Sequence, residues 1–273
     1  MDHATFQPVN KPVFLKLGGS LITDKTRPFT PRPDILESLA GQIARARRAR
    51  PELRLVLGHG SGSFGHVPAS QHRTRSGVSG REAWEGFSEV WYWASSLNHL
   101  VIESLHRAGI PAVSLAPVSA IVGRDGRISS WNLTPLKAAL ANGLLPVIYG
   151  DVIFDRGIGG TILSTEDLFD HLARRLKPQR ILLAGLETGV WKDFPKRKNL
   201  VEEITPGDFA AWTASLKGST SADVTGGMQS KVNQMLTLVT DIAGLEVSIF
   251  SGEGMDNLCR ALLGEAPGTS LHS

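Results

Sequence analysis

The chain has 273 residues, of which 41% are hydrophobic and 20% are charged, and its formal net charge is +3. This composition is typical of a globular protein, and no stretch approaches the run of about 18 apolar residues that a membrane-spanning helix needs. The only cysteine, Cys259, excludes an internal disulfide framework and a thiolate-rich metal site, and we expect it to pack on the apolar face of a helix. We therefore expect one compact unit in the cytoplasm, with no membrane partner.

Neither the N-terminal segment nor the densest basic run indicates a binding partner. Residues Met1 to Lys11 are polar and lack an apolar core, so they predict a short tail rather than a signal peptide. The densest basic run, Arg45 to Arg50, falls at the end of a predicted helix, where cations complement the helix dipole. No aromatic residues interrupt this run to stack on bases, so nucleic acid is not an expected partner.

Short apolar runs alternate with amphipathic helical patterns along the chain. The apolar runs predict buried strands of a mainly parallel sheet, and they are Val13–Leu17, Leu53–Leu57, Ala112–Leu115, Leu145–Tyr149, Ile181–Ala184 and Val247–Phe250. The helical patterns are Ile35–Ile43 behind an Asp34 cap, Trp84–Val101, Leu136–Leu140, Leu168–Leu176, Met228–Val239 and Leu258–Leu263. This alternation predicts an α/β fold.

Two local patterns lie in the middle of the chain. Ser164 to Asp167 matches a capping box, in which a hydroxyl and a carboxylate satisfy free amides at the start of a helix. Val152–Phe154 and Thr161–Leu163, separated by Asp155–Gly160, predict a hairpin that projects from the sheet. Such a hairpin could cover a ligand.

Three glycine-rich segments adjoin predicted strands or helices, where exposed backbone amides favour phosphate. They are Lys16–Ser20 with Lys25 beyond it, Gly58–His66, and Thr225–Met228 with Lys231 one helical turn further on. Each segment taken alone is more typical of a tight turn than of a ligand site. Their position in the fold therefore matters more than their composition.

The second segment contains a literal G-x-G-x-x-G pattern from Gly60 to Gly65, which raises a nicotinamide dinucleotide hypothesis. Pro68 and the polar stretch Ser70–Ser79 separate this loop from the next predicted helix, whereas the dinucleotide fingerprint opens a helix directly. Glu82 lies near the expected acidic spacing, so the hypothesis stays open. The chain has neither a Walker A ending nor a G-x-S-x-G elbow, so phosphate must be held in another way.

Four segments in chain order resemble the amino acid kinase superfamily, and within it most closely the isopentenyl phosphate kinases. They are Lys16–Ser20, Ser61–His66, Gly150-Asp151 and Asp223–Lys231. The resemblance extends roughly from Lys16 to Gly252, and Ser63–His66 with Asp24-Lys25 is its most specific part. It implies an open αβα sandwich and a homodimer, with the acceptor in the N-terminal half and the nucleotide in the C-terminal half. The pattern of elements places a soft boundary near residue 177, which gives an acceptor-binding half, 1–177, and a nucleotide-binding half, 178–273.

The resemblance also implies roles for individual residues on the donor side. ATP, accompanied by Mg²⁺, would contact Lys16, Gly18, Gly19, Ser20, Gly62, Asp193, Gly227 and Lys231. Lys25 would stabilise the charge of the transition state, so that Lys16, Lys25 and His66 form the catalytic set. Asp151 would orient the lysines. The nucleotide contacts are open to revision because Thr188–Trp191 replaces the family's Asp-Gly-Val-Tyr.

On the acceptor side, the resemblance places Ser61 and Gly62 between acceptor and donor and assigns His66 to the phosphate already present on the acceptor. Gly159 on the hairpin would contact the same substrate. Ser61 departs from the family's triple glycine and adds a hydroxyl there. We also expect an apolar pocket for the rest of the acceptor. Its wall would be one face of a helix, where three aromatic side chains lie at positions i, i+3 and i+7: Trp84, Phe87 and Trp91.

The expected activity is transfer of the ATP γ-phosphate to isopentenyl phosphate, with isopentenyl diphosphate and ADP as products. Three alternatives remain: a phosphonate kinase resembling fosfomycin kinase, a carboxylate-directed amino acid kinase, and a non-catalytic nucleotide-binding protein. A carboxylate-directed enzyme has no need of a phosphate-binding His66. The presence of Lys16, Lys25 and Lys231 argues against a non-catalytic protein.

Overall fold

The computed structural model describes residues 11–209 and 227–273. Its centre is an eight-stranded sheet in the order β12-β14-β13-β9-β1-β2-β6-β3, in which only the β13–β14 pair is antiparallel. The strands are β1 (Val13–Leu17), β2 (Leu55–His59), β3 (Ala112–Ser114), β6 (Leu145–Tyr149), β9 (Arg180–Gly185), β12 (Glu203–Ile204), β13 (Glu246–Ser251) and β14 (Thr269–Leu271). All six predicted strands lie in this sheet. The sequence did not predict β12 and β14, which are short and lie at the edge.

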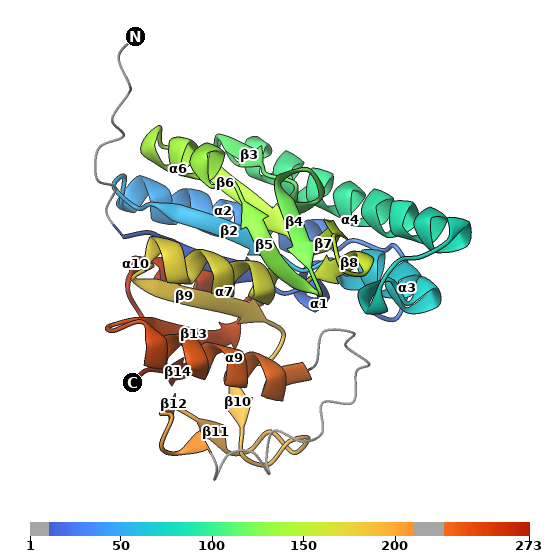
Figure 1. Cartoon of the computed structure of the whole chain (residues 1–273). Coiled ribbons are helices and arrows are strands. Elements are labelled where there is room, and N and C mark those ends of the chain that lie inside the picture. The colour runs from blue at the N-terminus through green and yellow to red at the C-terminus, as the bar shows by residue number, and fades with distance from the viewer. Residues whose placement is uncertain (1–10, 210–226) are drawn as a thin grey trace.

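Helices cover both faces of this sheet (Figure 1), so the predicted αβα sandwich is confirmed. Along β1, Leu15 packs into one core and Phe14 into the other, as the alternation of a strand requires. The first core contains residues of α2 (Pro33–Ala49), α4 (Arg81–Arg107) and α10 (Asn257–Leu263). The second contains residues of α6 (Thr134–Ala141), α7 (Thr165–Leu176) and α9 (Gly227–Asp241).

Two helix starts differ from the sequence prediction. The N-cap of α2 is Arg32 rather than Asp34, because Pro33 takes the first helical position, where its missing N–H costs nothing. The second difference is α3 (Gly62–His72), which opens directly from the second glycine segment and contains Pro68. The prediction that Pro68 separates this loop from a helix is therefore wrong.

A smaller four-stranded sheet lies beside α3 and α4 (Figure 1). It contains the predicted hairpin, β7 (Asp151–Asp155) and β8 (Gly159–Leu163), together with β4 (Ile121–Arg124) and β5 (Arg127–Trp131), which were not predicted. The buried carboxylate of Asp155 joins the two hairpins by accepting hydrogen bonds from the backbone amides of Asp125, Gly126, Gly157 and Ile158. The short remaining elements are α1 (Gly19–Ile22), α5 (Pro117–Ala120), the 3-10 turn η1 (Thr74–Ser76), β10 (Val190–Trp191) and β11 (Leu200–Val201).

Three smaller predictions can be compared with the structure. The capping box is present, because the Ser164 hydroxyl accepts from the Asp167 amide and the Asp167 carboxylate accepts from the Ser164 amide. Cys259 is buried on α10. In the described part of the chain, none of the helices has the length and apolar character to cross a membrane. The boundary near residue 177 falls between α7 and β9, and the division into two functional halves stays a prediction.

Candidate active site

A cavity of about 410 Å³ lies at the carboxyl ends of the central strands, where β1 has β2 on one side and β9 on the other. The carboxyl edge of a parallel sheet is where α/β proteins bind ligands, and this volume suits a small-molecule site. Ten of the residues predicted for the site line it: Lys16, Gly18, Gly19, Ser20, Lys25, Ser61, Gly62, His66, Gly227 and Lys231. The part of the third segment from Asp223 to Gly226 lies outside the described residues.

The first two glycine segments contact each other backbone to backbone. The Gly60 amide donates to the carbonyl of Leu17 at 3.0 Å, and a Cβ atom on Gly19 would lie 2.4 Å from the Gly62 nitrogen. Thr23 links the same two segments, because its hydroxyl donates to the Gly19 carbonyl at 2.7 Å and accepts from the Ser63 amide at 3.0 Å. Only glycine permits this approach, and Thr23 is a residue that sequence reasoning missed.

One backbone amide at this junction already donates a hydrogen bond within the protein, whereas others lie at helix starts and could donate to a ligand. The Gly18 amide donates to the Ala184 carbonyl at 2.8 Å, so it cannot also bind phosphate as predicted. Gly19 and Ser20 begin α1, and Ser61 and Gly62 occupy the cap and first position of α3. Amides at these positions have no preceding turn of helix to bond with, and all four residues line the cavity. Their amides could therefore donate to an anion in the cavity, and their role in binding phosphate stays a prediction.

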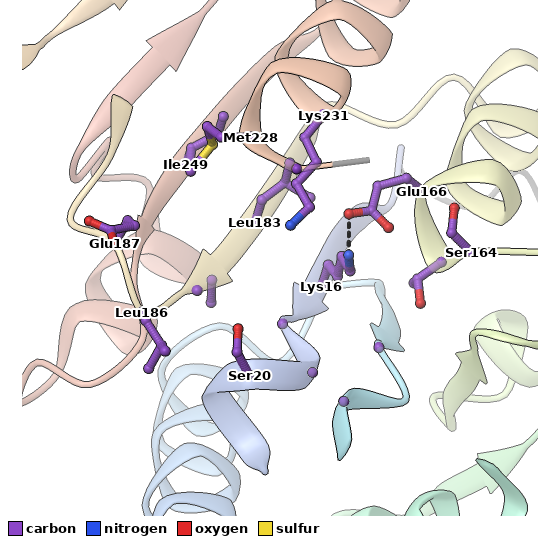
Figure 2. A pocket seen from close by; sticks show the side chains of 18 of the residues that line it. Lys16, Ser20, Ser164, Glu166, Leu183, Leu186, Glu187, Met228, Lys231 and Ile249 are labelled. Carbon is purple, nitrogen blue, oxygen red and sulfur yellow. Dashed lines mark hydrogen bonds and ion pairs between the residues drawn. The ribbon is translucent and has the colours of Figure 1, made fainter. Parts of the chain in front are cut away.

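Glu166 is the second functional residue that sequence reasoning missed. It forms an ion pair with Lys16, and the two residues are 4% and 7% exposed. Burial opposes ionisation of this carboxyl, but the charges of Lys16 and Lys231 outweigh it and hold its pKa below the ordinary value. Figure 2 shows the two lysines approaching Glu166 from different sides. A carboxylate inside a capping box, directly after a buried strand, is the only sequence signal for this role.

Asp151, predicted to orient the lysines, occupies a different position. One carboxyl oxygen accepts from the Val152 amide at 2.8 Å, and the other is buried without a hydrogen-bond partner among the described residues. Burial raises the pKa of this carboxyl to about 8. The ion pair with Lys16 belongs to Glu166 instead. Any influence of Asp151 on the lysines stays a prediction.

A second cavity of about 30 Å³ adjoins the first and shares four lining residues with it: Ser61, His66, Gly150 and Ile162. Its remaining wall is formed by Gly65, Ala69, Val90, Ala94 and Asp151. His66 thus lies where the large cavity, at the side that carries the lysines and glycine segments, meets a small, mostly apolar one. This arrangement suits a ligand with an anionic group and a short apolar tail.

Four residues predicted for the acceptor pocket do not line either cavity: Trp84, Phe87, Trp91 and Gly159. Trp84 and Phe87 pack against Phe154 of the hairpin, with ring centroids 5.9 and 5.1 Å from that of Phe154. Gly159 lies against the backbone of Val78, whose carbonyl oxygen would be 2.1 Å from an added Cβ atom. The helix spacing identified an apolar face correctly, but this part of the face supports the hairpin.

The opposite end of the large cavity is lined by apolar and aromatic side chains from the segment after β9. Glu187 binds Arg197 at 2.6 Å and the indole N–H of Trp191 at 3.0 Å, and the Arg197 guanidinium lies 4.9 Å from the Phe194 ring centroid. Asp193, predicted for the nucleotide pocket, does not line the cavity. Its carboxylate instead accepts from the backbone amides of Lys198 and Asn199, which holds the loop carrying Phe194 and Arg197.

The sequence model of the amino acid kinase family matches residues 11–251. The chain belongs to the amino acid kinase family. It is 36% identical to an isopentenyl phosphate kinase of Methanothermobacter thermautotrophicus, over 93% of this chain and 96% of that protein. It is also 36% identical to an isopentenyl phosphate kinase of Haloferax volcanii, over 95% and 98%. Among solved members of the family, an X-ray structure of isopentenyl phosphate kinase superposes with a TM-score of 0.78 at 32% identity, covering 94% of this chain and 99% of that one.

Proposed function

We propose that this chain transfers the γ-phosphate of ATP to isopentenyl phosphate, forming isopentenyl diphosphate and ADP. One observation carries the proposal: three lysines, two interlocked glycine segments and His66 line one cavity, and that cavity continues at His66 into a small apolar one. The isopentenyl phosphate kinases to which the chain is similar over nearly its whole length support the same acceptor.

The donor phosphates would lie between the amides of Gly19, Ser20, Ser61 and Gly62 and the side chains of Lys16 and Lys231. Phosphoryl transfer proceeds in line through a loose transition state, so catalysis depends on positioning and on neutralising charge. Glu166 fixes the Lys16 ammonium in a buried position, which removes the need to order that side chain during the reaction. Lys25, on the exposed side of the cavity, would stabilise the charge of the group in transit. The nucleoside would extend toward Leu186, Trp191 and Phe194.

The acceptor needs a binding group more than a base. A phosphate monoester has a second pKa of about 6, so its oxygen is already a nucleophile near neutral pH. His66 at the junction of the two cavities would bind that phosphate, and the apolar side chains of Ala69, Val90, Ala94 and Ile162 would contact the far end of the tail. The position of His66 therefore distinguishes a phosphate acceptor from a carboxylate acceptor.

Mg²⁺ would be held mainly by the phosphates of the nucleotide. The carboxylates of Glu166 and Glu187 line the cavity, and each is ion-paired with a basic side chain, so neither is an independent metal ligand. When bound, the ion would neutralise charge on the donor phosphates. A homodimer and a cytoplasmic location, which the family resemblance implies, belong to the same proposal; light scattering on the purified chain tests the first.

The experiment that tests the activity is an ADP-release assay with Mg-ATP and five acceptors: isopentenyl phosphate, dimethylallyl phosphate, fosfomycin, acetylglutamate and UMP. We expect turnover with the isoprenoid phosphates and at least about tenfold lower kcat/KM with the other three. Turnover of fosfomycin alone would favour the phosphonate kinase. ATP binding without turnover of any acceptor would favour the non-catalytic alternative and overturn the proposal.

A further inference from the structure

The small cavity has one polar wall that an isopentenyl tail cannot use. Asp151 is 1% exposed and lines this cavity, and its second carboxyl oxygen is buried without a hydrogen-bond partner among the described residues. The first oxygen is engaged by the Val152 amide. A buried polar atom without a partner is costly in a folded protein, so such an atom beside a cavity indicates a group that enters the cavity and satisfies it.

The size of the cavity limits what that group is. A volume of about 30 Å³ accommodates a water molecule or one hydroxyl on a ligand. Its other walls include the side chains of Ala69, Val90, Ala94 and Ile162, so Asp151 contributes a carboxyl group to an otherwise mostly apolar pocket. A hydroxyl both donates and accepts, and it therefore pairs with a carboxyl oxygen in either protonation state.

We propose that Asp151 is a specificity-determining residue that admits a hydroxyl group on the tail of the acceptor. The acceptor class would then include short, branched alcohol monophosphates that carry a second hydroxyl away from the phosphate. This inference rests on the proposed function, because it assumes that the acceptor phosphate lies at His66 and that only the far end of its tail reaches the small cavity.

The electrostatics of Asp151 are compatible with an anionic acceptor. Burial raises the pKa of its carboxyl to about 8, although the hydrogen bond from the Val152 amide and weaker interactions with the Val118 amide and the Tyr149 hydroxyl oppose the shift. At neutral pH the group is therefore mostly uncharged and does not repel a phosphate bound at His66 in the same cavity. A neutral carboxyl can donate its own O–H to the ligand hydroxyl as well as accept from it.

The test compares two acceptors that differ by one hydroxyl: isopentyl phosphate, and the same compound hydroxylated at its branched carbon. The measured quantity is the ratio of kcat/KM for the hydroxylated compound to that for isopentyl phosphate. In the wild type we expect a ratio within about threefold of one, because Asp151 replaces the hydrogen bonds that the hydroxyl loses from water. In Asp151→Leu, whose side chain has the same number and branching of heavy atoms but no polar atom, we expect the ratio to fall at least about tenfold.

Asp151→Asn is the matched variant, because its side chain keeps an acceptor for the Val152 amide and a polar group toward the cavity. We expect its ratio to stay within about threefold of the wild-type ratio. This variant and the wild-type ratio keep the inference testable if Asp151→Leu does not fold. A wild-type ratio below about one tenth, or an unchanged ratio in folded Asp151→Leu, would overturn the inference. If isopentenyl phosphate and isopentyl phosphate both fail as acceptors, the proposed function itself has failed.

Discussion

The part of the site that would bind the donor phosphates (the phosphate end) and the part that would bind the acceptor (the acceptor end) consist of different chemical groups. The phosphate end consists largely of backbone, with Gly18–Ser20 and Gly60–Gly62 following adjacent parallel strands and in direct contact. The acceptor end consists of side chains from α3, α4, β8 and the start of β7, which are brought together only by packing. Backbone recognition needs exact loop spacing and tolerates little change, whereas the acceptor end depends on side chains that can differ without loss of the fold.

The contact between the two glycine segments gives the largest predicted effect. In Gly19→Ala the added Cβ atom would meet the Gly62 nitrogen at 2.4 Å and its Cα atom at 2.6 Å. Neither backbone atom can rotate away, so one segment must shift and the amides leave their common site. We expect kcat/KM to fall by at least about 10³-fold, since misplaced groups are costly in a reaction that depends on positioning.

Gly41→Ala is the control for that substitution. Gly41 lies within α2, and its nearest contact for an added Cβ atom is the end of the Arg45 side chain at 3.7 Å. Alanine there should leave kcat/KM unchanged and raise the unfolding free energy by about 0.5–1 kcal/mol. Near-wild-type turnover by a folded Gly19→Ala protein would show that the two segments are not required to interlock.

Substitutions of Lys25 and His66 separate the role of the phosphate end from that of the acceptor end. Lys25→Ala should lower kcat by about 10²–10³-fold, because the charge it stabilises develops in the transition state. His66→Ala should mainly raise the acceptor KM, by about 10–100-fold, because a histidine that binds phosphate acts equally in the ground state. Steady-state kinetics with each substrate varied in turn separates the two effects.

Trp84→Ala provides the matched control on the acceptor side, since Trp84 packs on the hairpin and lines neither cavity. It should change the acceptor KM by less than about threefold. A large KM effect for Lys25→Ala together with a kcat effect for His66→Ala would mean that the two roles are interchanged.

The same comparison explains how far the sequence could be interpreted. Buried parallel strands are continuous apolar runs, and phosphate segments have fixed spacing, so both could be located without a structure. The role of Glu166 could not be predicted in this way, because Glu166 is 150 residues from Lys16 in the sequence and the two come into contact only in the folded chain. Helical periodicity identified the apolar face that contains Phe87, but periodicity does not show which element covers a face. The acceptor pocket was therefore the least predictable part of the site.

Glu166 provides a smaller and more specific test of the phosphate end. Glu166→Gln keeps the shape of the side chain but removes the charge that orients Lys16. We expect kcat to fall about 10–100-fold, and the unfolding free energy to fall by about 3 kcal/mol because a buried ion pair loses one partner. Activity assays and denaturant titrations measure the two effects. Asp170→Asn, which breaks an exposed ion pair with Arg174 on the same helix, should cost less than about 1 kcal/mol. A kcat within twofold of wild type in Glu166→Gln would remove the orienting role.

The last prediction concerns stability rather than turnover, at a buried histidine that contacts the second glycine segment. His59 is fully buried; its ring nitrogens lie 3.1 Å from the Gly60 carbonyl oxygen and 3.3 Å from the Asn98 side-chain oxygen. Burial, with a contribution from the charge of Lys16, lowers the pKa of this histidine to about 4 against the opposing effect of its hydrogen bonds. The folded protein therefore holds His59 neutral at pH values where the unfolded chain already binds a proton there.

Because the folded pKa of His59 lies below the unfolded value, its contribution to stability is present above pH 6.5 and is lost as the pH falls toward about 4. Between pH 7 and pH 5 this loss should amount to about 2 kcal/mol. Asp151 acts in the opposite direction, because its raised pKa stabilises the fold at low pH and that contribution is lost as the pH rises through about 8. Denaturant titrations of wild type and His59→Gln at both pH values isolate the histidine, since Asp151 is common to both proteins. Equal losses in the two proteins would show that His59 does not become protonated on unfolding in this range, whereas a loss about 2 kcal/mol smaller in His59→Gln would show that a neutral, buried histidine supports the phosphate segment.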